Sequence, residues 1–240
     1  MQEKVFIRNK AAQIFALVFV CDYPKRWPTF FTDLLQTLGM GPRTVDLYLR
    51  VLLAIDCEVV DREVIHSKEE ADRNTQIKDH MRESCVQDLV DSWFQIMVTS
   101  STITWYKSCP YWYRHATFTW TFSGFQTVYQ STDVDLVCQT LEVVGAYIAW
   151  INITLIANLR FVDLLVRFLR EIPLREAAAD CLHDIVAKGM DPVAKTKLVE
   201  SLLSVLDSAG ILNIEMASFY VMYLYTTLRV FSLNMLKAWD

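Results

Sequence analysis

Glycine and proline are scarce in this sequence, with 6 of each among 240 residues. Turn-rich β proteins and disordered chains are enriched in these residues, so their scarcity argues against both classes. Hydrophobic residues make up 53% of the chain and charged residues 21%. A chain of this kind can form one or two compact domains, or about five to six helical hairpins of about 40 residues each.

An excess of basic residues is also missing. Lysine and arginine total 23, aspartate and glutamate total 28, and the formal net charge is −5. The chain therefore lacks the basic footprint of proteins that bind nucleic acid on their own. Any contact with nucleic acid would need a local basic surface or another part of a larger protein.

The sequence contains no motif typical of catalysis or metal binding. It has no glycine-rich phosphate loop, no Gly-x-Ser-x-Gly and no His-Glu-x-x-His. No Cys-x-x-Cys pair occurs and the 4 histidines are dispersed, which argues against a zinc site. We expect no catalytic residue, no metal, no cofactor and no enzymatic activity, and we interpret His183 as an ordinary residue of a helix surface.

Cysteine pairs and membrane spans are not expected either. The 6 cysteines are scattered, and we expect them to be reduced and buried, as in an intracellular protein. The apolar run at 11–21 is too short to span a bilayer, and Arg229 interrupts the apolar stretch at 216–236. We expect no secretory signal and no contact with a membrane.

The sequence does contain apolar residues at helical spacing, with clear signals for the ends of the helices. An apolar-periodic run at 175–186 is followed by Lys-Gly-Met-Asp-Pro at 188–192 and by a second periodic run. Gly189 fits a left-handed helix end, Asp191 an N-cap and Pro192 the first helical position. The pattern predicts a helix over 173–188, a tight turn and a return helix over 191–208.

The same sequence pattern recurs along the chain. Small residues stand together at 11–12 and 177–179, and Leu141 and Leu182 align with an offset of 41 residues, the difference between 182 and 141. Small residues let two helices approach closely, and a period of about 40 residues is typical of stacked helical hairpins. The sequence predicts an all-α fold, an α-solenoid of HEAT-like antiparallel helix pairs.

Six further helices are expected, the fourth of them long and largely polar. They cover residues 3–21, 27–38, 42–60, 67–97, 132–150 and 153–170. Ser67 and Glu70 form a predicted capping box at the start of the fourth. Between Asp61 and Glu83 the chain holds seven acids and five bases, which is typical of a solvated helix or of an arm that projects toward a partner.

Two stretches depart from the helical pattern. Residues 98–128 are rich in Trp, Tyr, Phe and Thr and have no helical period, and the tail after Glu215 looks equally atypical. An aromatic loop could stack on bases, but we interpret this stretch as an insertion foreign to the solenoid. The predicted organisation is HEAT-like repeats at 1–97 and 129–214, an atypical insertion at 98–128 and an atypical tail at 215–240.

Four segments carry a resemblance to a known family: Phe-Ile-Arg-Asn-Lys-Ala-Ala-Gln at 6–13, Val-Asp-Leu-Tyr-Leu-Arg at 45–50, Leu-Glu-Val-Val-Gly-Ala-Tyr at 141–147 and the turn at 188–192. The chain resembles the tRNA-exporting receptors of the importin-β (karyopherin-β) family over about 3–97 and 129–214. The resemblance implies a superhelix of HEAT repeats that binds tRNA cooperatively with Ran-GTP, passes nuclear pore proteins and shuttles between nucleus and cytoplasm. It also implies that the chain begins inside the family's N-terminal arch and ends before most of the C-terminal arch.

The polar arm supplies the candidate residues for contact with tRNA or Ran: Arg73, Lys78 and Arg82. Basic side chains there could contact phosphates in a salt-sensitive way. Alternatively they pair with Glu69, Glu70 and Asp79 at helical spacing. A second functional reading also stays open, in which the chain is a generic helical-repeat scaffold that binds a partner helix or peptide without RNA cargo.

Overall fold

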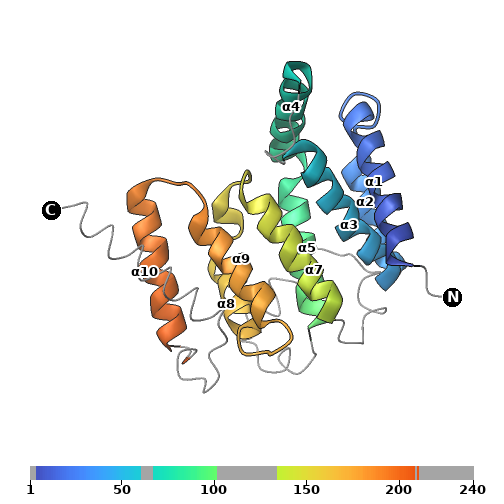
Figure 1. Ribbon diagram of the computed structural model, residues 1–240. Coiled ribbons are helices and arrows are strands. Elements are labelled where there is room, and N and C mark those ends of the chain that lie inside the picture. Colours follow the sequence, from blue (N-terminus) through green and yellow to red (C-terminus); the bar gives the residue numbers. More distant parts are fainter. Residues whose placement is uncertain (1–3, 61–66, 102–133, 209, 211–240) are drawn as a thin grey trace. The chain divides into compact units, whose positions relative to one another are not determined.

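The computed structural model describes residues 4–60, 67–101, 134–208 and 210, and these residues form helices without any strand among them (Figure 1). The all-α prediction is confirmed for this part of the chain. The chain divides into two compact units, Met1–Thr140 and Leu141–Asp240. Most of the predicted insertion at 98–128 and all of the predicted tail at 215–240 lie outside the described residues, so the predicted domain boundaries stay predictions.

The first unit contains most of the described helices. They are α1 (Val5–Asp22), α2 (Phe30–Gln36), the 3₁₀ helix η1 (Thr37–Met40), α3 (Pro42–Val59), α4 (Lys68–Ser84) and α5 (Val86–Ser100). α1 packs along α3, as Figure 1 shows. Of the predicted small pair, Ala12 is buried on α1 and Ala11 is half-buried, and Ala16, one turn after Ala12, is buried as well.

An aromatic cluster fixes the end of α1 against α2. The ring of Phe19 lies 4.7 Å from the ring of Tyr23 and 4.7 Å from that of Phe30, measured between ring centres. Phe31 adds an edge contact 5.3 Å from Phe19. Such offset and edge-to-face pairs add about 0.5–1.5 kcal/mol each beyond the burial of their apolar area.

The capping box at the start of α4 is confirmed. The Glu70 amide donates to Ser67 Oγ at 3.3 Å, and the Ser67 amide donates to Glu70 Oε2 at 2.8 Å. The prediction of one continuous helix to about residue 97 is wrong, because Cys85 has a φ of −139° and separates α4 from α5. The break lets α4 keep a polar exposed side while α5 buries Leu89 and Trp93.

The remaining helices are α7 (Val134–Ile148), η3 (Ile153–Leu155), α8 (Leu159–Phe168), α9 (Arg175–Ala187) and α10 (Pro192–Ser208). The predicted single return helix over 153–170 is wrong in its first part. Asn158 interrupts it, since its side chain accepts hydrogen bonds from the amides of Arg160 and Phe161 at 3.1 and 3.2 Å. Asparagine competes with the helical backbone in this way and favours a cap over a helix interior.

The turn before α10 confirms part of the prediction. The Ala194 amide donates to Asp191 Oδ2 at 3.0 Å, and Pro192 is the first residue of α10. Gly189 does not adopt a left-handed conformation, so that prediction is wrong. The residue that ends α9 is Lys188, which is extended with φ −54° and ψ 132°.

The cysteines follow the prediction only in part. Cys85 and Cys181 are buried, whereas Cys21 and Cys57 are exposed, so burial was wrongly predicted for the latter two. Among the described helices none is long and apolar enough to cross a membrane.

Candidate functional site

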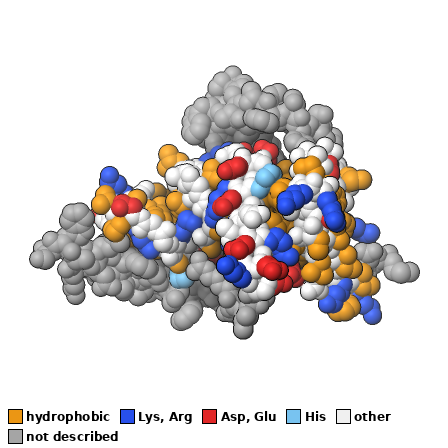
Figure 2. All heavy atoms as spheres, turned by 90° about the horizontal axis from the view of Figure 1, so that it is seen from above, with side chains coloured by type: hydrophobic (Ala, Val, Ile, Leu, Met, Phe, Trp, Pro, Cys, Tyr) orange, Lys and Arg blue, Asp and Glu red, His pale blue; other side chains and the backbone are white. Residues whose placement is uncertain are grey.

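The three predicted site residues all lie on α4, but they do not form one cluster. Lys78 and Arg82 are four residues apart and share a side of the helix, while Arg73 lies well round it. Arg82 pairs with Asp79, and Arg73 donates to Asn74 Oδ1 at 3.3 Å. Figure 2 shows red and blue side chains interleaved over this part of the surface, so α4 presents mixed charge.

The inner side of α4 is held by polar contacts at both ends. Asn74 is buried and its Nδ2 donates to the backbone oxygen of Glu58 at 3.1 Å, which satisfies a carbonyl at the end of α3. Near the other end, Tyr23 Oη lies 2.6 Å from His80 Nδ1 and 3.2 Å from Ser84 Oγ. Burial raises the pKa of Tyr23 to about 12, so its phenol stays protonated at neutral pH.

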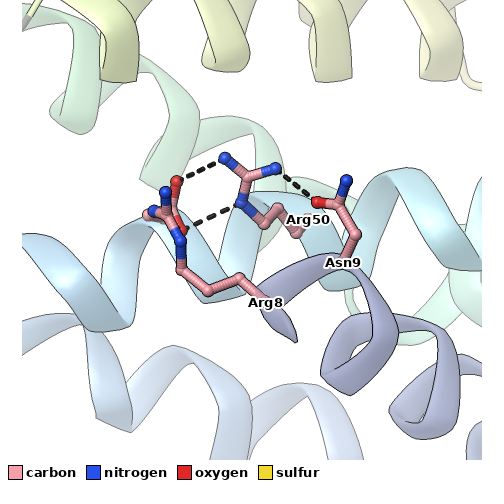
Figure 3. Close-up of polar contacts among 4 residues, drawn as sticks. Arg8, Asn9 and Arg50 are labelled. Atoms are coloured by element: carbon pink, nitrogen blue, oxygen red, sulfur yellow. Dashed lines mark hydrogen bonds and ion pairs between the residues drawn. The ribbon is translucent and has the colours of Figure 1, made fainter. Parts of the chain in front are cut away.

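A buried carboxylate joins α1 to α3 (Figure 3). Asp46 is only 6% exposed, and its Oδ2 accepts from Arg8 Nη1 at 2.7 Å and from Arg50 Nε at 2.9 Å. Arg50 Nη2 donates to the other carboxylate oxygen at 2.9 Å, which makes this pair bidentate. Arg50 Nη1 also donates to Asn9 Oδ1 at 2.5 Å, so Arg50 reaches back to α1 as well.

The arginines keep Asp46 ionised. Burial by itself would raise the pKa of this carboxyl, but hydrogen bonds and attraction from Arg50, with further hydrogen bonds from Gln139 and Arg8, hold the pKa below its usual value. Gln139 belongs to the part of α7 that lies in the first unit. One ionised side chain therefore ties together three helices that are distant in sequence.

We call a set of contacts that holds two neighbouring parallel helices a joint, and the contacts of Asp46 between α1 and α3 are the first. A second joint connects α7 and α9 within the other unit. A Cβ atom on Gly145 would lie 2.6 Å from Asp184 Oδ2, so the two helices approach closely there. Lys188 Nζ donates to the backbone oxygens of Ile148 and Ala149 at 2.5 and 3.1 Å. These partners are separated by 39–40 residues, and the Arg8–Asp46 pair by 38, which agrees with the repeat of about 40 residues.

In both joints the partners advance in the same direction along the sequence. Arg8 meets Asp46 and Asn9 meets Arg50, and likewise position 145 meets 184 while 148 meets 188. The joined helices are therefore parallel, as first helices of successive hairpins must be. This is the arrangement expected of a helical-repeat solenoid.

The sequence interpretation missed the Asp46 network. Asp46 and Arg50 stand four residues apart on α3, a spacing at which opposite charges commonly pair on a helix surface. Their position inside an otherwise apolar run, at 45–53, was the available signal that the pair is buried. The described residues contain no group of His, Cys, Asp or Glu side chains arranged to hold a metal ion.

Comparison with known proteins gives one consistent result. Exportin-T of Danio rerio is 54% identical over 213 residues, which cover 89% of this chain and 19% of that protein. Exportin-T of Homo sapiens is 50% identical with the same coverage, and that of Dictyostelium discoideum is 35% identical over 201 residues. The chain thus spans 16–19% of the length of these relatives.

A family model also matches most of the chain. Residues 4–182 match the family described as Exportin 1-like protein, and this range includes α1 to α8 and most of α9. The contacts of Asp46 with Arg8 and Arg50 lie within it, and so does Gly145, whereas Asp184 and Lys188 lie just beyond it. On this match, which covers well over half of its length, the chain belongs to the Exportin 1-like protein family.

Proposed function

We propose that the chain is a segment of a nuclear export receptor that binds tRNA cooperatively with Ran-GTP and carries it through the nuclear pore to the cytoplasm. The observation that carries this proposal is its 50–54% identity to Exportin-T over 89% of the chain. Its partners are then tRNA, Ran-GTP and nuclear pore proteins, with no membrane and no catalytic step. Its location alternates between nucleus and cytoplasm.

Stacked helices suit such a carrier because two partners can stabilise one arrangement of the stack. If Ran-GTP and tRNA both favour the same arrangement, each raises the affinity for the other by the same factor. The joint at Asp46 and the joint at Gly145 fix neighbouring helices through a few side chains. Such joints support the proposal, since each holds two neighbouring parallel helices of a repeat together.

Arg73, Lys78 and Arg82 are the side chains on α4 that we propose for contact with tRNA or Ran. Lys78 and Arg82 lie on one side of the helix. A lysine or arginine that contacts phosphate weakens binding when it is removed and lowers the salt dependence by about one counterion. Replacing Lys78 by alanine tests this, with Lys68→Ala at the exposed start of α4 as the matched control.

The proposal is tested by placing this chain in full-length exportin-T in place of the corresponding stretch. The chimera should retain tRNA in a pull-down with Ran-GTP and lose it with Ran-GDP. Unmodified exportin-T is the positive control. If the folded chimera binds tRNA equally with and without Ran-GTP, the receptor function is wrong for this chain.

A second candidate function is a helical scaffold that binds a partner helix without RNA. It is favoured by one observation, the large apolar side chains exposed along α1. In that case the chimera would lose tRNA binding under both conditions while the chain still binds an amphipathic helix.

A further inference from the structure

One side of α8 carries a row of arginines, which we call the α8 arginine row: Arg160, Arg167 and Arg170. Their spacing places them on one side of a helix with 3.6 residues per turn, and the row extends over about 15 Å at about 1.5 Å per residue. Arg170 lies just past the end of α8, but its amide donates to the Arg167 oxygen at 3.0 Å and continues the turn. Arg160 and Arg170 are exposed and Arg167 is half-buried, so the row forms a line of positive charge at the surface.

The opposite side of α8 is buried. Phe161, Leu165 and Phe168 lie there, and α8 packs on α9 and α10 (Figure 1). The row therefore lies on a helix that its own unit covers from behind. Covering charged side chains with a further helix would cost free energy unless they found partners in it. The row is thus a surface for solvent or for an oppositely charged partner, and it is not a packing face between repeats.

Positive charge exceeds negative charge along this side of α8. Asp163 is the one acid within α8, and its carboxylate pairs with Arg167 at 2.9 Å. At the C-terminal end of the helix, Arg175 Nε donates to the Leu169 oxygen at 2.8 Å and its Nη2 to the Arg170 oxygen at 3.4 Å. Among the described residues no carboxylate lies at ion-pair distance from Arg175. Arg175 therefore adds a fourth guanidinium at the end of the row, where the helix dipole also favours cations.

The neighbouring helix carries the opposite charge. Residues 159–175 hold four arginines and two acids, whereas residues 176–187 of α9 hold three acids and no lysine or arginine. Glu176 and Asp180 are exposed, and the pKa of Asp180 is raised by burial and by the charge of Glu176. Because α8 and α9 pack with their buried sides together, the arginine row and these acids point away from each other. A polyanion is attracted to the α8 side and repelled from the α9 side, although the chain as a whole carries a net charge of −5.

We propose that the α8 arginine row binds the phosphate backbone of RNA. Arginine presents a planar fork of donors that matches the oxygens of a phosphate. No apolar residue is exposed between Arg160 and Arg170, whereas protein interfaces are built around apolar or aromatic anchors, so the row suits phosphates better than a protein partner. The inference rests on the proposed function, since the RNA that the row would hold is the tRNA cargo.

The test uses the chimera of full-length exportin-T that carries this chain. Its affinity for tRNA is measured by fluorescence anisotropy at saturating Ran-GTP and at several salt concentrations. Arg160→Gln and Arg170→Gln each remove one charge from the row, and Arg43→Gln, an exposed arginine of α3, is their control. Asp163→Asn removes the acid from the row, and Asp180→Asn makes the same change of net charge on the other side of the α8–α9 pair.

We expect Arg160→Gln and Arg170→Gln each to weaken tRNA binding about fivefold at physiological salt and to lower the salt dependence by about one counterion. Asp163→Asn should strengthen binding by about two- to fivefold, because it removes an exposed charge that repels phosphate. Asp180→Asn and Arg43→Gln should change neither quantity. Equal strengthening by Asp163→Asn and Asp180→Asn would overturn the proposal, since only net charge would then matter. It is also overturned if the arginine variants weaken the binding of Ran-GTP alone and leave tRNA affinity unchanged, because the row would then bind protein.

The inference and the proposed function fail in different ways. The receptor function is wrong if the unsubstituted chimera binds tRNA equally with Ran-GTP and with Ran-GDP, and the variants still decide whether the row contacts RNA. The row alone is wrong if the chimera requires Ran-GTP but no arginine variant changes tRNA affinity or its salt dependence. A folded chimera that binds no tRNA overturns both.

Discussion

Each of the two joints holds a pair of parallel helices together, but the two use different side-chain chemistry. Between α1 and α3, a buried Asp46 is held by Arg8 and Arg50. Between α7 and α9, the helices meet at Gly145, and Lys188 reaches backbone oxygens at the end of α7. The first joint depends on an ionised carboxylate, and the second depends on the absence of a side chain and on a surface lysine.

A repeat of about 40 residues therefore determines which helices lie side by side, but it does not determine which side chains hold them together. The position of Asp46 on α3 corresponds to the position of Asp184 on α9 in the sense that each faces the preceding parallel helix. Asp46 meets an arginine there, and Asp184 meets a glycine. The two joints should therefore respond differently to substitution and to acid.

The largest effect is expected from Asp46→Ala. It leaves the guanidinium groups of Arg8 and Arg50 partly buried without their acid, which should lower the free energy of unfolding by about 3 kcal/mol. Urea denaturation followed by circular dichroism measures this loss. Asp79→Ala is the control, because its pair with Arg82 is exposed and should contribute no more than about 1 kcal/mol. Equal losses in the two variants would show that Asp46 does not hold a joint.

Acidification should change the contributions of Asp46 and Asp184 to the free energy of unfolding in opposite directions. The pKa of Asp46 is lowered in the folded chain, so its stabilisation is present above the unfolded value of about 3.9 and is lost as the pH falls below it. The pKa of Asp184 is raised, first by burial and further by Asp180, with His183 opposing. As the pH falls through that raised pKa, the folded chain takes up a proton before the unfolded chain, and its stability rises.

The measurement is the free energy of unfolding of Asp46→Asn and Asp184→Asn across this pH range. At neutral pH the first variant should be less stable than the wild type and the second more stable. Both differences should shrink on acidification. The difference for Asp184→Asn should shrink first, as the pH falls through the raised pKa of Asp184, and that for Asp46→Asn only as the pH falls below about 3.9. Differences of the same sign at neutral pH would contradict the contrast between the joints.

Close approach at Gly145 should appear as coupling between two positions. Gly145→Ala brings a Cβ to within 2.6 Å of Asp184 Oδ2, which offsets the gain of about 1 kcal/mol that alanine gives in a helix. In the Asp184→Ala background the full gain should return, a coupling of about 1 kcal/mol in a double-mutant cycle. Gly189→Ala has nothing within 4 Å of its added Cβ, so its effect should be the same in both backgrounds. Additive effects at positions 145 and 184 would rule out the steric contact.

The sequence was sufficient for features that depend on local chemistry. The capping box at Ser67 and the cap at Asp191 are set by residues three positions apart, and both are confirmed. The all-α class followed from periodicity and from scarce glycine and proline, and it is confirmed for the described residues. The resemblance at the four segments is confirmed by the family match over 4–182.

Features that depend on tertiary packing could not be predicted in this way. The break at Cys85 has no glycine or proline to mark it. Gly189 looked like a left-handed helix end, but the chain leaves α9 one residue earlier in an extended conformation. The Arg8–Asp46 pair joins residues 38 positions apart, and no local pattern shows which arginine a buried aspartate will meet.

The smallest effect is expected from Lys188→Met, which keeps the length of the side chain and removes its charge. The lost hydrogen bonds to the oxygens of Ile148 and Ala149 involve carbonyls at the end of α7, where a cation also interacts favourably with the helix dipole. Because Lys188 is partly exposed, water can replace the ammonium, and the loss should be about 0.5–1 kcal/mol. Amide hydrogen exchange should show faster exchange in the last turn of α7 and no change in α1 or α3, while the exposed Lys197→Met changes neither. Faster exchange throughout the chain would mean that Lys188 supports the whole unit, and the second joint would then depend on charge as strongly as the first.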